Sequence, residues 1–415
     1  MISLKPISIS LSPNTEKDDV LLALRLLFQP WRYLRGQEAS ELEREFEKYS
    51  GLKYAISFNS GRSALMAILA SLSMEKDSEV LLQAFTCNAA SNPILWSGLK
   101  PVYVDCLEEN FNMDTEDLKR KITSRSRAVI IQHTFGMPAN IEETLNICRQ
   151  NNLILIEDCA HSLGAKYKGK KVGTFGDVSF FSFSRDKIIS SVYGGMAALN
   201  NEELARKIRD FQEKAGYPSY FWVKQQLMHP LLMNLLILPT YRLFGKYFLV
   251  LSQWLHILSK AVHSGEKRGQ KPGYFPRRMP NALAGLARKQ LAKAERFNHH
   301  RRELAAFYKE NLKNTKYLLP EISGDSDPAF LRFSLRHPLA HDIIRKAWER
   351  NLLIGDWYAC PIAPCGTNIE KLKYVLGSCP ASEELSEDTL NLPTHINISV
   401  KDAKKIVDFL IKNGN

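Results

Sequence analysis

The chain has 415 residues, of which 45% are hydrophobic and 24% are charged. This composition excludes a disordered, collagen-like or coiled-coil chain, and the length predicts two domains or one large domain with an appendage. The net charge is +12, and Ala215–Pro280 holds nine Lys or Arg residues against one acid, Glu266. Because the positive charge is so localised, we expect no nucleic-acid partner.

The first residues and the cysteines bear on the compartment in which the protein works. Met1–Pro13 lacks a basic stretch followed by a long apolar run, so we expect no signal peptide. The seven cysteines are scattered and form no C-x-x-C pair, which fits reduced thiols better than a disulfide framework. We therefore expect a cytoplasmic protein, and no metal site is predicted.

Apolar runs and helical patterns alternate over about the first 200 residues. Short apolar runs separated by helices indicate βαβ units, and hence a mainly parallel sheet with helices on both faces. The predicted strands are Tyr54–Phe58, Glu79–Leu82, Pro101–Asp105, Ala128–Gln132, Leu153–Glu157 and Val178–Phe183. The predicted helices are Ser63–Leu72, Asn88–Ser97, Thr115–Ile122 and Ile141–Gln150.

Residues 215–272 interrupt this pattern with a segment that is both apolar and basic. Pro residues and Gly245 break its apolar stretch, so a simple membrane span is not expected. Within Tyr241–Lys260 the spacing predicts an amphipathic helix with a polar stripe of Arg242, Lys246, Gln253, His256 and Lys260. Its broad apolar face consists of Leu243, Phe244, Tyr247, Phe248, Val250, Leu251, Trp254, Leu255 and Leu258.

The sequence around this segment completes the predicted organisation. The basic, Gly- and Pro-containing stretch Ser264–Gly273 is predicted to be a mobile linker. Helical periodicity returns at Asn281 and is followed by mixed strands and helices. We therefore divide the chain into an N-terminal segment with a large α/β domain (1–214), an apolar basic helical insert (215–272) and a small C-terminal α/β domain (273–415).

Polar residues with a common chemistry follow three of the predicted strands, and ligands bind at such strand ends. Asp158 ends one strand, and Lys187 follows another shortly before a Gly-Gly pair. Asn59–Leu65 is a turn of small residues that opens a helix, whose free N–H groups can hold a phosphate. An acid for a ring nitrogen, a lysine for a Schiff base and an anion-binding helix start are what pyridoxal phosphate requires.

Each of these residues also has an ordinary structural explanation. An Asp after a strand is usually a helix cap or a turn residue, and a lone Lys usually lies on the surface. A Gly-Arg-Ser turn is commonly no more than the start of a helix. The order and spacing of the three together favour the cofactor site.

The motifs resemble those of the DegT/DnrJ/EryC1/StrS family of pyridoxal-phosphate sugar aminotransferases over nearly the whole chain outside 215–272. Seven of them occur in the family's order. They are Ser60–Leu65 (S-G-T-x-A-L), Pro101–Asp105 (P-V-F-V-D), His133–Ala139 (H-x-x-G-x-P-A), Ile156–Ala165 (I-E-D-x-A-H/Q-x-x-G-A), Gly173–Asp177, Phe181–Lys187 (F-S-F-x-x-x-K) and Asn391–His395 (L-P-x-H).

The resemblance implies a fold and a set of site residues. The fold is that of the aspartate-aminotransferase-like, type I pyridoxal-phosphate enzymes, with a mainly parallel large-domain sheet and a homodimeric assembly. Lys187 would form the Schiff base and move the proton, and Asp158 would pair with the pyridine nitrogen, with His161 beside the ring. The residues expected around the phosphate are Gly61, Arg62, Ser63 and Ser182.

Three positions depart from the family pattern. Arg62 replaces the usual Thr, and its charge suits a phosphate. Cys87 stands where an aromatic residue commonly stacks on the cofactor ring; Phe85 or His133 is an alternative for that role. Pro276 stands where an Asn would reach the partner subunit's phosphate, so Arg277 or Arg278 is a candidate replacement.

The function implied by the resemblance is amino transfer, from glutamate in most of the family, to a nucleotide-linked keto-sugar for surface-polysaccharide or amino-sugar biosynthesis. Two alternatives stay open: a pyridoxal-phosphate enzyme acting on amino acids, and a non-catalytic membrane-associated scaffold. For the 215–272 insert the alternatives are an extra helical layer, packed on the protein's own surface or across a dimer, and peripheral contact with the inner face of a membrane.

Overall fold

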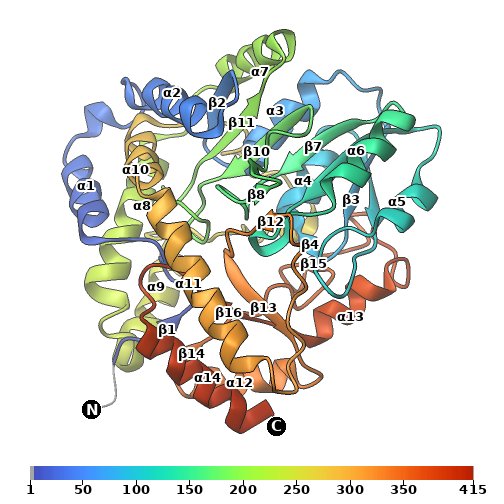
Figure 1. Cartoon of the computed structure of the whole chain (residues 1–415). Coiled ribbons are helices and arrows are strands. Elements are labelled where there is room, and N and C mark those ends of the chain that lie inside the picture. Colours follow the sequence, from blue (N-terminus) through green and yellow to red (C-terminus); the bar gives the residue numbers. More distant parts are fainter. Residues whose placement is uncertain (1–3, 415) are drawn as a thin grey trace.

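The computed structural model describes residues 4–414. The first three residues of Met1–Pro13, the stretch in which no signal peptide is expected, therefore lie outside the described residues. A seven-stranded sheet forms its centre (Figure 1). In spatial order the strands are β2 (Tyr54–Phe58), β11 (Gly195–Leu199), β10 (Val178–Ser182), β7 (Ile154–Asp158), β6 (Ser126–Gln132), β3 (Glu79–Gln83) and β5 (Lys100–Val104).

The sheet is mixed, because β11 runs antiparallel to both of its neighbours, β2 and β10. The pairs β10–β7, β7–β6, β6–β3 and β3–β5 are parallel, as the alternating pattern predicts. The six predicted strands are present with shifts of one or two residues at their ends. β11 was not predicted from the sequence, because its Gly-Met-Ala-Ala-Leu run lacks β-branched residues.

Successive side chains of the strands enter two separate buried clusters. Leu81 lies in one cluster, whereas its neighbours Val80 and Leu82 lie in the other. This alternation follows from the period of two along a strand and means that both faces of the sheet are covered. Helices α3 (Gly61–Ser71), α4 (Asn88–Trp96) and α7 (Glu202–Ala215) contribute to the cluster on one face. The cluster on the other face includes residues of α1 (Lys17–Leu27), α2 (Glu38–Ser50), α5 (Thr115–Lys121), α6 (Ile141–Gln150) and α10 (Asn281–Leu291).

The C-terminal third of the chain builds another buried cluster, below the sheet in Figure 1. A two-stranded antiparallel sheet, β13 (Arg332–Arg336) with β16 (Thr389–Pro393), lies at its centre. The cluster is completed by residues of α11 (Ala294–Leu312), α12 (Ala340–Glu349), α13 (Pro380–Asp388) and α14 (Val400–Gly414).

Short strand pairs tie this part to the rest of the chain. The parallel pair β4 (Thr86–Cys87) with β15 (Ile362–Ala363) brings the loop before β15 next to the main sheet. The others are β1 (Ile7–Ser8) with β14 (Leu352–Leu353), and a three-stranded sheet of β12 (Ser326–Asp327), β8 (Lys166–Tyr167) and β9 (Lys170–Lys171).

Residues 215–272 fold as several short helices, rather than as the predicted amphipathic helix followed by a mobile linker. They are α8 (Tyr220–Leu232), the π-helical turns η3 (Met233–Ile237) and η4 (Tyr241–Gly245), α9 (Lys246–Trp254) and the 3₁₀ turn η5 (Glu266–Arg268). The chain bends by 111° between Tyr220–Ile237 and Tyr241–Trp254, at a short break that contains Pro239. Gly245 permits this close crossing, because a Cβ there would lie 2.2 Å from the carbonyl oxygen of Ile237.

Two predictions about this segment need correction. The helix expected over Tyr241–Lys260 ends at Trp254, so His256 and Lys260 lie beyond it. The stretch Ser264–Gly273 is packed rather than free: Glu266 is fully buried, and its carbonyl accepts hydrogen bonds from Asn88 and Asn92 of α4. Among the described residues no single helix is long and apolar enough to cross a membrane, although the bent pair meets that test together.

The cysteines also depart from expectation. A disulfide joins Cys360 to Cys365, so the prediction of reduced thiols is wrong for this pair. The C-x4-C spacing of this pair belongs to no regular cysteine framework, so the sequence alone did not indicate the disulfide. The other five cysteines are free.

Candidate active site

A cavity of about 410 Å³ lies at the carboxyl ends of the central strands. Asp158 at the end of β7, Ser182 at the end of β10 and Lys187 in the following loop all line it. The first turn of α3 supplies Gly61 and Arg62. The parallel strands thus bring together residues that are up to 126 positions apart, as their places in the sequence predict.

Seven of the eight predicted site residues line this cavity. They are Gly61, Arg62, Cys87, Asp158, His161, Ser182 and Lys187. Ser63 does not: it is fully buried, its hydroxyl donates to Asn59 Oδ1, and its backbone N–H donates to Ser60 Oγ. The capping of the helix by Ser60 therefore turns Ser63 away from the cavity.

The start of α3 is built for close approach to an anion. Ser60 caps the helix through the N–H of Ser63, which leaves the earlier first-turn N–H groups without an intrahelical partner. A Cβ on Gly61 would meet Ser182 Cβ at 3.1 Å, and a Cβ on Gly195 would meet Gly61 N at 2.4 Å. Glycine at both positions lets the helix start, β10 and β11 converge.

Lys187 is a partly buried lysine that forms no ion pair with another described residue. Among the residues that the structure describes, no carboxylate lies within 4.0 Å of its Nζ, which sits 5.1 Å from the ring centroid of Trp357. Burial lowers the pKa of Lys187 to about 8, and the nearby Arg332 charge acts in the same direction, while Cys87 and Asp158 oppose it. A substantial share of the amine is therefore neutral near physiological pH.

Asp158 is a buried carboxyl with spare acceptor capacity. It is 5% exposed, and its Oδ1 accepts one hydrogen bond, from the N–H of Ala160 at 2.9 Å. Burial raises the pKa of Asp158 to about 6, although the Ala160 N–H, Lys187 and His133 favour the charged form. A cationic partner in the cavity would stabilise this carboxylate.

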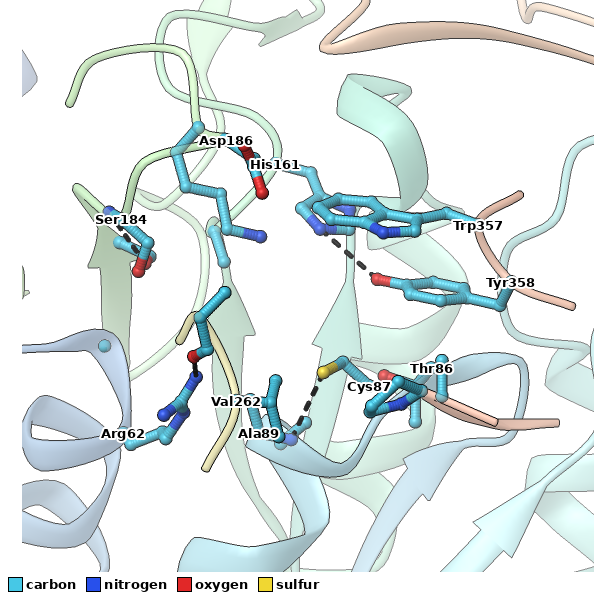
Figure 2. Close-up of a pocket in the computed structure, with 18 of the residues that line it drawn as sticks. Arg62, Thr86, Cys87, Ala89, His161, Ser184, Asp186, Val262, Trp357 and Tyr358 are labelled. Carbon is cyan, nitrogen blue, oxygen red and sulfur yellow. Dashed lines mark hydrogen bonds between the residues drawn. The ribbon is translucent and has the colours of Figure 1, made fainter. Parts of the chain in front are cut away.

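His161 is held as a neutral ring among aromatic side chains. Its Nδ1 accepts from the N–H of Phe135 at 3.3 Å, so Nε2 carries the proton and donates to Tyr358 Oη at 3.3 Å. Burial moves the pKa of His161 well below its ordinary value. The rings of Trp357 and Tyr358 lie beside it in Figure 2, with Trp357 at a centroid distance of 5.6 Å.

Neither alternative for an aromatic partner at the Cys87 position reaches the cavity. Phe85 is fully buried against Phe111, Phe135 and Tyr358. His133 is also buried, and its Nε2 lies 3.2 Å from Glu157. Although burial opposes it, this contact and the N–H groups of Gly173 and Gly176 lower the pKa of Glu157. The pair is part of the scaffold beneath the cavity.

The aromatic lining comes instead from the C-terminal part of the chain. Trp357 and Tyr358, in the loop before β15, line the cavity and were not predicted as site residues. Behind Trp357 lies Arg332, whose Cζ is 3.3 Å from the indole centroid. Arg332 is 3% exposed and has no ion pair within the described part of the chain. Burial lowers its pKa to about 10.

The remaining wall comes from residues 259–270, which we call the strap. Ala261, Val262 and Lys267 of the strap line the cavity (Figure 2 shows Val262). Arg185 donates to the backbone and hydroxyl oxygens of Ser259, each at 2.8 Å, and Tyr193 Oη donates to the carbonyl of Lys260. Residues 264–270 of the strap belong to the stretch Ser264–Gly273 that was predicted to be a mobile linker.

A buried ion pair fixes the strap to the start of α3. Arg62 Nη1 lies 2.9 Å from a carboxylate oxygen of Glu266, and its Nη2 donates to the carbonyl of Ala261. Although burial opposes it, the Glu266 carboxylate raises the pKa of Arg62. Arg62 Cζ also lies 5.1 Å from the Phe275 ring centroid.

The candidates for replacing the family's Asn are engaged elsewhere. Arg277 donates to the carbonyls of Ala215 and Gly273, and Arg278 lies over the ring of Tyr217. Neither lines this chain's own cavity, and a role of either arginine at the partner subunit's phosphate stays a prediction.

A partly buried amine and a buried carboxyl beside a helix N-terminus, at the carboxyl ends of parallel strands, define a cofactor-dependent α/β enzyme. Comparison with known families then identifies the chain. The DegT/DnrJ/EryC1/StrS aminotransferase family model matches residues 14–232 and 252–411, so the chain belongs to this family. The residues between the matched stretches, 233–251, include η3, η4 and the first two thirds of α9.

Individual relatives agree with this assignment. The GDP-perosamine synthase of Escherichia coli O157:H7 is 29% identical over 68% of this chain and 65% of its own length. The dTDP-3-amino-3,6-dideoxy-alpha-D-galactopyranose transaminase of Aneurinibacillus thermoaerophilus is 27% identical over 94% of this chain and 93% of its own. Among the first four curated relatives, the matched segments span 45% to 65% of the relative's length.

Solved structures give the same fold. A putative sugar aminotransferase from Streptococcus pneumoniae, in its PMP form, superimposes with a TM-score of 0.76 and 18% identity over 97% of this chain and 96% of its own. The aminotransferase fold predicted from the motifs is thereby confirmed. The cofactor of this family is pyridoxal 5'-phosphate.

Proposed function

We propose that the protein transfers an amino group from an amino-acid donor, glutamate, to a nucleotide-linked keto-sugar with pyridoxal 5'-phosphate as cofactor. The observation that carries the proposal is the convergence of Lys187, Asp158 and the first turn of α3 on one cavity. The named relatives, a GDP-perosamine synthase and a dTDP-sugar transaminase, support the nucleotide-sugar substrate class.

The donor set fits the cofactor at three places. Asp158 provides an anionic acceptor for a protonated ring nitrogen, and Lys187 provides an amine whose pKa is lowered to about 8. The free N–H groups of α3, with the hydroxyls of Ser182 and Ser184, provide the phosphate site. Glycine at position 61 leaves this cradle open where a side chain would fill it.

When bound, pyridoxal phosphate supplies an electron sink that stabilises negative charge at the substrate carbon. The Nζ of Lys187 holds the cofactor in the resting enzyme and carries the proton to and from the reacting carbon. Because burial lowers its pKa to about 8, this amine can both accept and release a proton near neutral pH. The Asp158 carboxylate keeps the ring nitrogen protonated.

His161, Trp357 and Tyr358 form an aromatic wall beside the expected ring position. The neutral His161 adds no charge next to the ring, and its hydrogen bond fixes the Tyr358 hydroxyl. Cys87 contacts the same cavity, with its Sγ accepting from the N–H of Ala89. These side chains orient the ring and exclude water.

Arg332 is our candidate for holding the carboxylate of the amino donor. A buried guanidinium with no carboxylate partner is costly unless a ligand supplies one. Arg332 influences both Lys187 and His161 electrostatically, which puts it close to the reacting groups. Trp357 lies against Arg332 and would have to move aside for a carboxylate to reach it.

The proposal is tested with the absorbance spectrum of protein saturated with pyridoxal phosphate. A visible band that borohydride traps on Lys187, and that glutamate bleaches, is expected. Nucleotide keto-sugars and free keto-acids are then compared as amino acceptors. Turnover with keto-acids alone would favour the amino-acid enzyme, and no band dependent on Lys187 would favour the non-catalytic scaffold.

Arg332→Ala tests the donor site separately. Loss of a charge-assisted bond of about 1.5–3 kcal/mol predicts roughly a 10- to 150-fold higher KM for glutamate. The visible band should persist, and kcat should change less than KM. An unchanged KM for glutamate would show that another group holds the donor.

The homodimer expected from the family stays a prediction.

A further inference from the structure

The helices between Tyr220 and Ile257 expose an unusual amount of apolar surface. Eleven of the 23 large apolar side chains that are exposed in the described part of the chain come from this stretch, which is less than a tenth of the sequence. An even spread would place about two there. The concentration therefore indicates a contact surface rather than ordinary scatter.

The densest part of this surface is one face of η4 and α9. The opposite face packs on a small buried cluster that contains Ile237 and Leu258. On the exposed face, Tyr247, Val250 and Trp254 have accessible fractions of 65%, 67% and 73%. Steps of three and four residues put these side chains on one side of the helix. We call Leu243, Tyr247, Val250, Leu251 and Trp254 the apolar face.

The charges around the apolar face have one sign. No Asp or Glu occurs from Tyr220 to Lys260, whereas Lys224, Arg242, Lys246 and Lys260 are exposed there. The next acid along the chain, Glu266, is fully buried against Arg62. The ammonium nitrogen of Lys246 lies 4.8 Å from the ring centroid of Tyr247, which places a positive charge directly beside the apolar face.

We propose that the apolar face docks onto an anionic membrane surface, with the helix lying in the plane of the interface. Apolar and aromatic side chains would enter the headgroup layer, while the flanking lysines and arginine meet lipid phosphates. Since no single described helix is long enough to span a bilayer, the segment would lie on the membrane. This inference does not depend on the proposed reaction.

Charge favours a lipid surface over a second copy of the chain. A twofold contact through this face would place the same lysines and arginine of both copies against each other. With no acid in the stretch, such a contact would gain no ion pair and would suffer repulsion. An anionic lipid surface provides the opposite charge throughout.

The docked helix would be continuous with the active-site wall. α9 ends at Trp254, and the strap that lines the cavity begins five residues later at Ser259. Tyr193 and Arg62 hold the strap through the carbonyls of Lys260 and Ala261. The membrane contact would therefore lie within a few residues of the substrate cavity.

Flotation of the full-length protein, saturated with pyridoxal phosphate, tests the proposal. We expect it to float with vesicles of phosphatidylcholine and phosphatidylglycerol, and to float less with phosphatidylcholine alone or at high salt. Val250→Glu/Trp254→Glu should reduce the bound fraction at least about tenfold. Val375→Glu/Leu376→Glu is the matched control, because both side chains are 68% exposed elsewhere.

The proposal would be overturned if the wild type floated with neither the anionic nor the neutral vesicles. It would also be overturned if Val250→Glu/Trp254→Glu floated with anionic vesicles as well as the wild type does. If that variant instead shows a lower sedimentation mass while the wild type does not float, the face joins copies of the chain and the proposal is wrong. Should it fail to fold, Arg242→Ser/Lys246→Ser retains the apolar face. This second variant must lose the preference for anionic vesicles.

Discussion

The sheet region, residues 54–199, and the helical segment 220–258 use apolar side chains in opposite ways. In the sheet, every residue of β3 and β11 is buried, because helices cover both faces. In α9 only Ser252 is buried, and most of its large apolar residues, Tyr247, Val250, Leu251 and Trp254, are exposed. A closed core leaves only the strand ends available for chemistry, whereas an uncovered apolar face is available for contact with another surface.

The strap connects the two regions, and an ion pair joins it to the sheet region. Glu266 on the strap pairs with Arg62 on α3, at the end of the cavity where we place the phosphate. One wall of the site is therefore fixed by strand order, while the other is held by this buried ion pair together with hydrogen bonds from Arg185 and Tyr193. Variants that act on one region alone can separate these contributions.

The largest effect is expected in the sheet region. Lys187→Ala removes the amine that holds the cofactor and carries the proton, so kcat should fall by at least about 10³-fold and the visible band should disappear. Lys170→Ala is the control, because Lys170 is an exposed lysine outside the cavity. Retention of more than a tenth of the activity would contradict the assignment of Lys187.

Asp158→Asn should weaken cofactor binding by about 2–5 kcal/mol, or roughly 30- to 4,000-fold, because a buried charge pair loses one partner. Burial raises the pKa of Asp158 to about 6, so the wild-type carboxyl loses its charge as the pH falls through that value. Cofactor affinity of the wild type should therefore drop below about pH 6. Titration with pyridoxal phosphate at several pH values, followed by the visible band, would show this drop in affinity in the wild type. If Asp158→Asn showed the same drop below about pH 6, Asp158 would be excluded as its cause.

These residues illustrate what local sequence can predict. Asp158, Lys187 and the α3 turn each follow a strand whose apolar run is visible in the sequence, so their meeting at one sheet edge could be predicted. Trp357 could not, because it reaches the cavity through the pairing of β15 with β4, to which no local pattern points. Arg332 could not either, because it comes from β13 and lies against the Trp357 ring. The strap was misjudged for a related reason. The Gly, Lys and Pro content of Ser264–Gly273 is typical of a free linker, but Glu266 is fixed by a partner 204 residues away.

Glu266→Gln should lower the free energy of unfolding by about 3 kcal/mol, since it leaves the Arg62 charge buried without its counter-ion. Thermal or urea unfolding measures the effect. In Arg62→Ala/Glu266→Gln the loss should be smaller than the sum of the single changes, because the two groups interact directly. Additive effects would mean that the pair does not fix the strap.

The smallest effect is expected in the helical segment, and there the prediction is near-neutrality. Trp254→Ser and Val250→Ser remove apolar atoms that already contact water, so each should change the stability by less than about 0.5 kcal/mol. Leu81→Ala, in the fully buried β3, should cost about 2–5 kcal/mol because it leaves a cavity in the core. If Trp254→Ser proved as costly as Leu81→Ala in dilute solution, the apolar face would already be covered there by another copy. If the cost appeared only when anionic vesicles were present during unfolding, the missing cover would be the lipid, because a ligand stabilises only the state that it binds.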